Sequence, residues 1–145
     1  MSKESQFLSE EDELEIIEAI KTAETNTSGE IRIHIEATSK KEAYERALDV
    51  FEELGIHKTE QRNGVLLYIA VTDQQFAICG DEGINNVVAD DFWDSTRDVI
   101  TEHFKKGNFK NGIVAGVLST GIQLKQFFPW QTDDENELSN EISKG

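Results

Sequence analysis

The sequence predicts one small, strongly acidic α/β domain built on a mixed sheet whose second strand is central. Three observations predict it. Helical and strand-like patterns alternate along the chain. The run 65–71 is apolar on both faces, as in a strand that is covered on each side. The length of 145 residues is normal for a single domain with its own core.

The first two elements are a helix and a strand. Ser9 is a suitable N-cap for a helix over 9–24, and acidic residues occupy the first turn, where the helix dipole favours them. An apolar stripe of Leu14, Ile17 and Ile20 repeats at helical spacing. A strand follows over 30–37, in which apolar and polar residues alternate. One polar face is typical of a strand near a sheet edge.

The middle of the chain predicts a helix and a hairpin. Ser39 and Glu42 have the spacing of a capping box, which opens a helix over 40–54 that Gly55 ends. The inward residues of this helix would be Tyr44, Ala47, Phe51 and Leu54. The central strand over 65–71 comes next, and a short turn at 72–75 leads into a third strand over 75–79.

The last third predicts two helices and a tail. The first helix covers 86–106, 108–111 is a loop, and an apolar helix over 112–128 is stopped by Pro129. Residues 131–145 are polar and acidic without periodicity, which predicts a disordered tail. With 1–8 as a flexible N-terminus, the domain spans 9–130.

The predicted topology gathers acidic residues at one end of the sheet. The crossover over 40–54 joins parallel strands, and the tight turn makes the third strand antiparallel to the second. The starts of strands one and two then meet the end of strand three. This end collects the candidate metal ligands Glu30, Asp81, Glu82, Asp90, Asp91 and Asp94.

Such a cluster of carboxylates favours a divalent cation. Ca²⁺ takes about six to eight oxygen ligands from carboxylates, carbonyls and water, whereas Mg²⁺ is possible with fewer protein ligands. The chain has no EF-hand loop spacing. The alternative is that each of these acidic residues is simply solvated on the surface of an acidic protein.

Charge and composition exclude several classes of partner. The formal net charge of −15 disfavours nucleic acids and anionic membranes. No stretch approaches the roughly 18 apolar residues of a membrane span, and no signal-peptide pattern opens the chain, so we expect a cytoplasmic monomer. The single cysteine, Cys79, lies in an apolar run typical of the core.

Several segments together resemble the TPM domain family. They are GEIRIHI at 29–35, NGVLLYIA at 63–70, AICGDEGI at 77–84 and FKKGNFKNGI at 104–113, with Asp90 between the last two. The resemblance covers roughly residues 10–125. It implies a Rossmann-like, three-layer αβα sandwich with an acidic pocket that binds Ca²⁺, and possible acid phosphatase activity. It places the family's acidic residues on Asp81, Glu82 and Asp90, beside Asp91 and Asp94.

These observations favour a non-catalytic Ca²⁺-binding module that stabilises or docks with another protein. One alternative is a metal-dependent acid phosphatase that hydrolyses phosphomonoesters, in which metal ions would hold phosphate and activate water. The chain has no Cys-x5-Arg loop, no Asp-x-Asp-x-Thr motif and no P-loop. A second alternative is an acidic protein-interaction domain without a metal.

Overall fold

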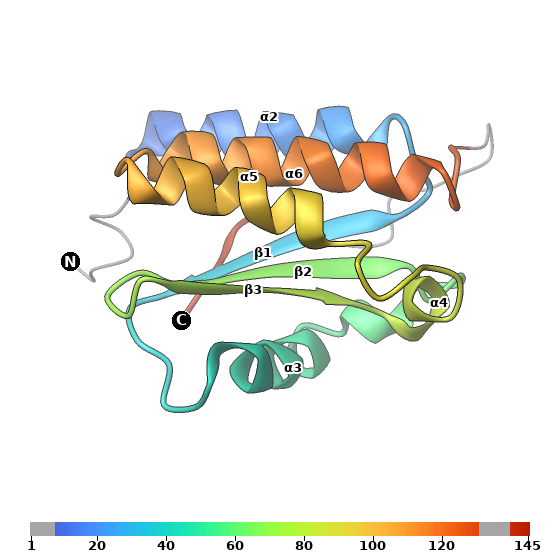
Figure 1. The fold of residues 1–145 in the computed structure, drawn as a ribbon, viewed down its shortest axis with the longest axis horizontal. Coiled ribbons are helices and arrows are strands. Elements are labelled where there is room, and N and C mark those ends of the chain that lie inside the picture. The colour runs from blue at the N-terminus through green and yellow to red at the C-terminus, as the bar shows by residue number, and fades with distance from the viewer. Residues whose placement is uncertain (1–7, 131–139) are drawn as a thin grey trace.

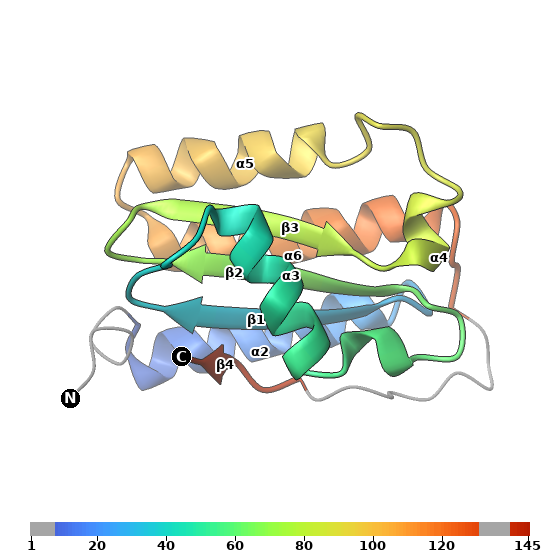
Figure 2. The ribbon, with the colours of Figure 1, turned by 90° about the horizontal axis from the view of Figure 1, so that it is seen from below.

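A four-stranded sheet in the order β3-β2-β1-β4 organises the fold (Figure 2). The computed structural model describes residues 8–130 and 140–145. The strands are β1 (Glu30–Glu36), β2 (Gly64–Ala70), β3 (Gln75–Gly80) and β4 (Ser143–Lys144). The helices are α2 (Glu10–Glu24), α3 (Ala43–Glu53), the 3-10 turn η1 (Ile56–Lys58), α4 (Glu82–Asn85), α5 (Asp94–Lys105) and α6 (Phe109–Lys125).

Helices cover both faces of the sheet, which confirms the three-layer α/β architecture. Helices α2, α5 and α6 lie on one face and α3 on the other (Figure 1). Strand alternation explains the layers, because Ile31, Ile33 and Ile35 pack into the core beneath α2, α5 and α6. On β2, Leu66 and Tyr68 point the other way, into a second core with α3. β2 is buried along its whole length and is an inner strand, as its apolar run predicts.

Strand directions also agree with the predicted topology. β1 runs parallel to β2, with Glu30 opposite Gly64, and β2 runs antiparallel to β3, with Val65 opposite Gly80. The starts of β1 and β2 therefore lie beside the end of β3. This is the end of the sheet at which the sequence places the acidic residues.

The prediction for the start of α3 is wrong. The helix begins at Ala43, and Glu42 caps it by accepting a hydrogen bond from the Glu45 amide. Ser39 does not form the predicted capping box, because its hydroxyl bonds within its own turn and its amide donates to Asp73. The buried face is Ala43, Ala47, Val50 and Phe51, whereas Tyr44 is exposed.

The segment between β3 and α6 also differs from the prediction. Of the helix expected over 86–106, only α5, from Asp94 onward, forms, and residues 86–93 are a series of turns. The short helix α4, which Asp81 caps at its N-terminus, precedes these turns. α6 begins at Phe109 rather than 112, and it ends at Lys125, before Pro129. Pro129 instead forms an isolated bridge with Thr27.

The predicted disordered tail is wrong for the last residues. Ser143 and Lys144 form β4, which pairs in parallel with His34 and Ile35 of β1. β1 is therefore an inner strand of the sheet, and its polar residues Glu30, His34 and Glu36 are buried. The remainder of the predicted tail, 131–139, and most of the predicted flexible N-terminus, 1–7, lie outside the described residues. Across 8–130 and 140–145, no helix combines the length and the apolarity that a membrane span requires.

Candidate functional site

An arginine clamp holds two acidic residues of the predicted site, Asp81 and Glu82. Arg62, in the loop before β2, donates from Nε and Nη2 to both oxygens of Asp81, over 2.8 and 3.0 Å. Its Nη1 donates to Glu82 over 3.0 Å. Asp81 is buried, whereas Glu82 is exposed. A bidentate pair of this kind fixes both partners, because the planar guanidinium matches the geometry of a carboxylate.

The backbone around the clamp explains why it forms. Asp81 accepts a hydrogen bond from the Glu82 amide and so caps α4. The Gly83 amide donates to the Arg62 carbonyl over 2.9 Å, and a Cβ at position 83 would lie 2.3 Å from the Gln61 carbonyl oxygen. Arg62 itself has a positive φ of 53°, a conformation that non-glycine residues adopt at some cost. The two segments are thus fastened by both backbone and side chain.

Three further predicted ligands, Asp90, Asp91 and Asp94, lie in the connection from β3 to α5. We call this connection, residues 81–94, the acidic connection (Figure 1). Asp90, Asp91 and Asp94 are all exposed. Asp94 pairs with Arg97 on its own helix over 3.1 Å. In the described part of the chain, Asp90 and Asp91 have no ion-pair partner. The acidic connection is therefore rich in accessible carboxylate oxygens and poor in counter-charge.

The predicted ligands do not converge on one preformed centre. Within 8–130 and 140–145, no group of three or more His, Cys, Asp or Glu side chains is arranged to hold a metal ion. The donor chemistry suits a hard divalent cation, since carboxylates and carbonyls are its preferred ligands. The inner carboxylate, Asp81, is already neutralised by Arg62. The predicted ligands whose carboxylates stay exposed to solvent are therefore Glu82, Asp90, Asp91 and Asp94.

Glu30 belongs to a different environment from the acidic connection. It is buried at the start of β1, and its negative charge helps to raise the pKa of Glu24. Burial is the largest cause and brings the pKa of Glu24 to about 7, although the carboxylate accepts a hydrogen bond from the Ile31 amide. Glu24 and Glu30 therefore form a second, partly buried acidic pair.

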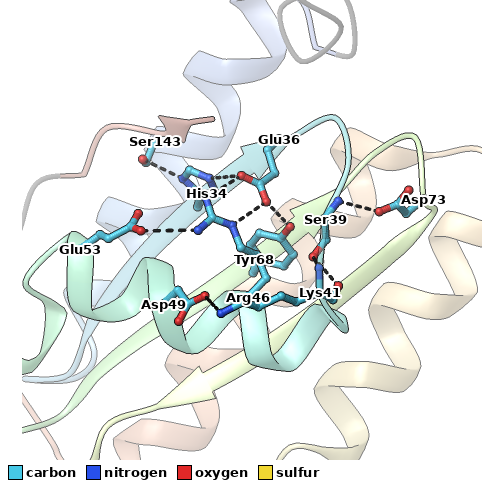
Figure 3. A network of polar contacts seen from close by, with 10 residues as sticks. All are labelled: His34, Glu36, Ser39, Lys41, Arg46, Asp49, Glu53, Tyr68, Asp73 and Ser143. Carbon is cyan, nitrogen blue, oxygen red and sulfur yellow. Dashed lines mark hydrogen bonds and ion pairs between the residues drawn. The ribbon is translucent and has the colours of Figure 1, made fainter.

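Sequence reasoning missed a buried polar network at the other end of β1 (Figure 3). Glu36 is its centre: Arg46 of α3 donates to both carboxylate oxygens, over 3.0 and 3.1 Å, and the Tyr68 hydroxyl also donates to it. His34 Nε2 lies 3.1 Å from Glu36 Oε1. Burial raises the pKa of Glu36, but hydrogen bonds from Arg46, Tyr68 and His34 outweigh it and lower that pKa to about 2.

The network reaches the last residues through His34. Its Nδ1 lies 2.9 Å from the Ser143 hydroxyl of β4. Two signals in the sequence could have revealed the network: a tyrosine within the aliphatic run of β2, and a histidine and a glutamate two residues apart on the strand beside it. Their partners in α3 and β4 come from distant parts of the chain, so the pattern gives no pairing.

Cys79 is the core residue that its apolar context predicts. Its thiol is buried, and burial raises its pKa to about 11. A thiol with such a pKa is almost entirely protonated at neutral pH and is a poor nucleophile. Cys79 packs in the core between the sheet and α3.

The sheet order and the helices on both faces define a small three-layer αβα domain, and an acidic connection follows its third strand. The family model for the TPM domain matches residues 1–122, and the chain belongs to this family. No curated protein matches the chain.

Solved structures share the fold. The NMR structure of the BA42 protein from the psychrophilic bacterium Bizionia argentinensis is 53% identical, covers 97% of each chain and superposes with a TM-score of 0.93. The N-terminal domain of a P. gingivalis protein has a TM-score of 0.67 at 18% identity, over 84% of this chain and 79% of that chain. The N-terminal domain of cg2496 from Corynebacterium glutamicum has a TM-score of 0.66 at 12% identity, over 97% and 83%. The last two likenesses show the fold alone.

Proposed function

We propose that this protein is a divalent-cation-binding TPM domain, with Ca²⁺ as the preferred ion and Mg²⁺ as a weaker one. The observation that carries the proposal is the acidic connection. Four of its carboxylates are exposed, those of Glu82, Asp90, Asp91 and Asp94. Among the described residues they form only two ion pairs, Glu82 with Arg62 and Asp94 with Arg97. A doubly charged ion with many oxygen ligands is the counter-charge that suits such exposed carboxylates best.

Arg62 acts in this proposal as a built-in counter-charge. Its bidentate pair with Asp81 keeps α4 and the preceding loop together without a metal. Its contact with Glu82 is exposed, so this contact costs little to replace. A bound cation would tie Glu82 to the turns at 90–94 and stabilise the native state through linkage.

The proposed role is binding rather than catalysis. Cys79 is buried with a raised pKa, and His34 lies toward the opposite end of β1 from Glu30. His34 is four positions after Glu30 along the strand, which is roughly 13 Å at the usual strand rise. The acidic connection contains no serine, threonine, cysteine, histidine or lysine, so it offers no hydroxyl, thiol or amine nucleophile of its own.

Calcium titration tests the proposal. We expect Ca²⁺ to raise the melting temperature by several degrees and to shift backbone amide NMR signals over 81–94. Because Asp90 and Asp91 have no ion-pair partner in the described chain, D90N/D91N should weaken Ca²⁺ binding at least tenfold and remove the thermal shift.

The matched control is E10Q/E11Q, which removes two exposed acidic residues from the first turn of α2 and changes the net charge equally. This control should bind Ca²⁺ as the wild type does. If Ca²⁺ binding weakened equally in both variants, the overall negative charge would explain the binding, and a defined site would be contradicted. An unchanged melting curve in millimolar Ca²⁺ would refute cation binding altogether.

A phosphatase assay separates binding from catalysis. We expect no hydrolysis of para-nitrophenyl phosphate with Ca²⁺, with Mg²⁺ or without metal. Metal-dependent turnover that disappears in D90N/D91N but persists in E10Q/E11Q would replace the proposed module with a phosphatase at the same residues.

A further inference from the structure

We propose that the outer edge of β1 is a peptide-binding site, which residues 140–145 of the chain fill as a displaceable intramolecular ligand. We call these residues the C-terminal segment. The peptide that the edge would take is extended and carries an apolar residue, a serine, a lysine and a glycine in succession. This inference is independent of the proposed cation site, which lies at the opposite end of the sheet.

Backbone pairing gives the edge its affinity for an extended chain. β4 is only two residues long, and it pairs in parallel with His34 and Ile35. The Gly145 amide continues the ladder by donating to the Ile35 carbonyl over 2.9 Å. Addition of a strand to an exposed sheet edge is a recurring mode of peptide recognition, in which side-chain pockets provide the specificity.

Two side chains of the C-terminal segment, the apolar Ile142 and the basic Lys144, contact the core and α2. Ile142 packs against the core beneath α2. Lys144 forms an ion pair with Glu13, in the acidic first turn of α2. An apolar side chain followed two positions later by a basic one is therefore matched by an apolar surface and an acidic helix start.

The other two residues of the segment, Ser143 and Gly145, lie against the buried polar network around Glu36 (Figure 3). Ser143 bonds to His34 Nδ1, and Glu36 holds His34 from the other side of the ring. A Cβ at Gly145 would lie 2.5 Å from Glu36 Oε1 and 2.8 Å from His34 Nε2, so only glycine fits there. Arg46 and Tyr68 fix Glu36, which cannot move aside without losing its charge-assisted hydrogen bonds.

The segment has the character of a ligand rather than of a core strand. Its pairing is short, and Glu141, Lys144 and Gly145 are exposed. A tethered ligand competes with a free peptide through its high effective concentration. The wild-type edge should therefore bind a free peptide poorly. Substitutions that weaken the contacts of the C-terminal segment should make the edge available to the peptide.

The test uses the full chain. In I142D/G145V, the segment loses its apolar contact and gains a Cβ where none fits. We expect the free peptide Asn-Glu-Ile-Ser-Lys-Gly to bind this variant saturably, with amide shifts over 32–36 and at Glu13, and to bind the wild type at least tenfold more weakly. A control peptide with alanine for serine and valine for glycine should not bind either protein. Equal binding of both peptides, or no binding of the first to the variant, would overturn the proposal.

Hydrogen exchange in the wild type gives a second, independent measurement. If the segment detaches while the rest stays folded, the Gly145 amide exchanges at least a hundredfold faster than the amides that pair β1 with β2. Equal exchange rates would show that β4 opens only with global unfolding, and the segment would then be an integral strand and not a ligand.

Discussion

At the scale of single residues, Glu36 links burial, charge and stability. Its pKa of about 2 in the folded protein lies below the ordinary value of 4.5. Its ion pair therefore stabilises the protein fully above about pH 4.5, and this contribution is lost as the pH falls toward 2. Removal of one partner from a buried pair leaves the other uncompensated, at a cost of about 3 kcal/mol.

We therefore expect Glu36→Gln to lower the free energy of unfolding by about 3 kcal/mol at pH 7, and by much less at pH 3. The control is Glu53→Gln, because Glu53 also contacts Arg46, at 3.5 Å, but is exposed. It should cost under about 0.5 kcal/mol. Urea denaturation at both pH values measures the difference, and a cost that stays constant with pH would contradict the assigned charge state.

The pKa of Glu24 is shifted in the direction opposite to that of Glu36, so its effect on stability has the opposite pH dependence. Its pKa is raised from 4.5 to about 7, so the folded state holds a proton that the unfolded state releases. Stability therefore falls as the pH rises from about 4.5 to 7, and the penalty is complete above that range. We expect Glu24→Gln to stabilise the protein by roughly 1–3 kcal/mol at pH 8 and to have little effect at pH 4.

A control for this prediction is Glu18→Gln, on the same helix and exposed. Its effect should be small and nearly independent of pH. Thermal unfolding across pH 4–8 provides the measurement. Destabilisation of Glu24→Gln at pH 8 would show that the carboxylate is charged and favourable in the folded protein.

At the scale of elements, close contact between α4 and the loop before β2 positions the start of the acidic connection. We expect Gly83→Ala to lower the free energy of unfolding by about 2–3 kcal/mol, because the added Cβ meets backbone that cannot move without breaking the Arg62 clamp. Gly107→Ala is the comparison. Gly107 has a positive φ of 76° but open space around it, so alanine should cost only about 1 kcal/mol there.

Chemical denaturation of both variants tests this reasoning. If Gly83→Ala lowered the free energy of unfolding less than Gly107→Ala, the loop before β2 would be able to shift at little cost. The Arg62 clamp would then not hold that loop in place. The packing of Trp93 explains why the long helix expected over 86–106 does not form. Asp81 caps α4, and the chain must then turn over 86–93 to place the buried Trp93 against Gly80 before α5 can begin.

At the scale of the whole molecule, the two proposed sites lie at opposite ends of one sheet. The acidic connection follows β3 at the end where β1 and β2 start, and the buried polar network lies where β1 ends. The net charge of −15 supports both proposals, because the proposed metal ion and the proposed lysine-bearing peptide each carry positive charge. The rigid sheet keeps the two sites apart, so each can be tested without disturbing the other.

The sequence by itself determined the order and directions of β1, β2 and β3 and the presence of helices before, between and after them. Period-two alternation in β1, the two-sided apolar run of β2 and the short turn before β3 were sufficient, because strand pattern and turn length depend on neighbouring residues. Together they predict the sheet directions and the common end of the acidic residues. Local pattern could not supply the partners of these residues.

Only the tertiary structure decided which charges are neutralised and which remain accessible. Arg62 and Asp81 are 19 residues apart, and His34 and Ser143 are 109 apart. A pairing across such distances leaves no periodic signal, since it depends on how whole elements pack. Packing therefore fixed Asp81 in the clamp, left Asp90 and Asp91 in solvent, and made the last residues a fourth strand where composition alone predicts disorder.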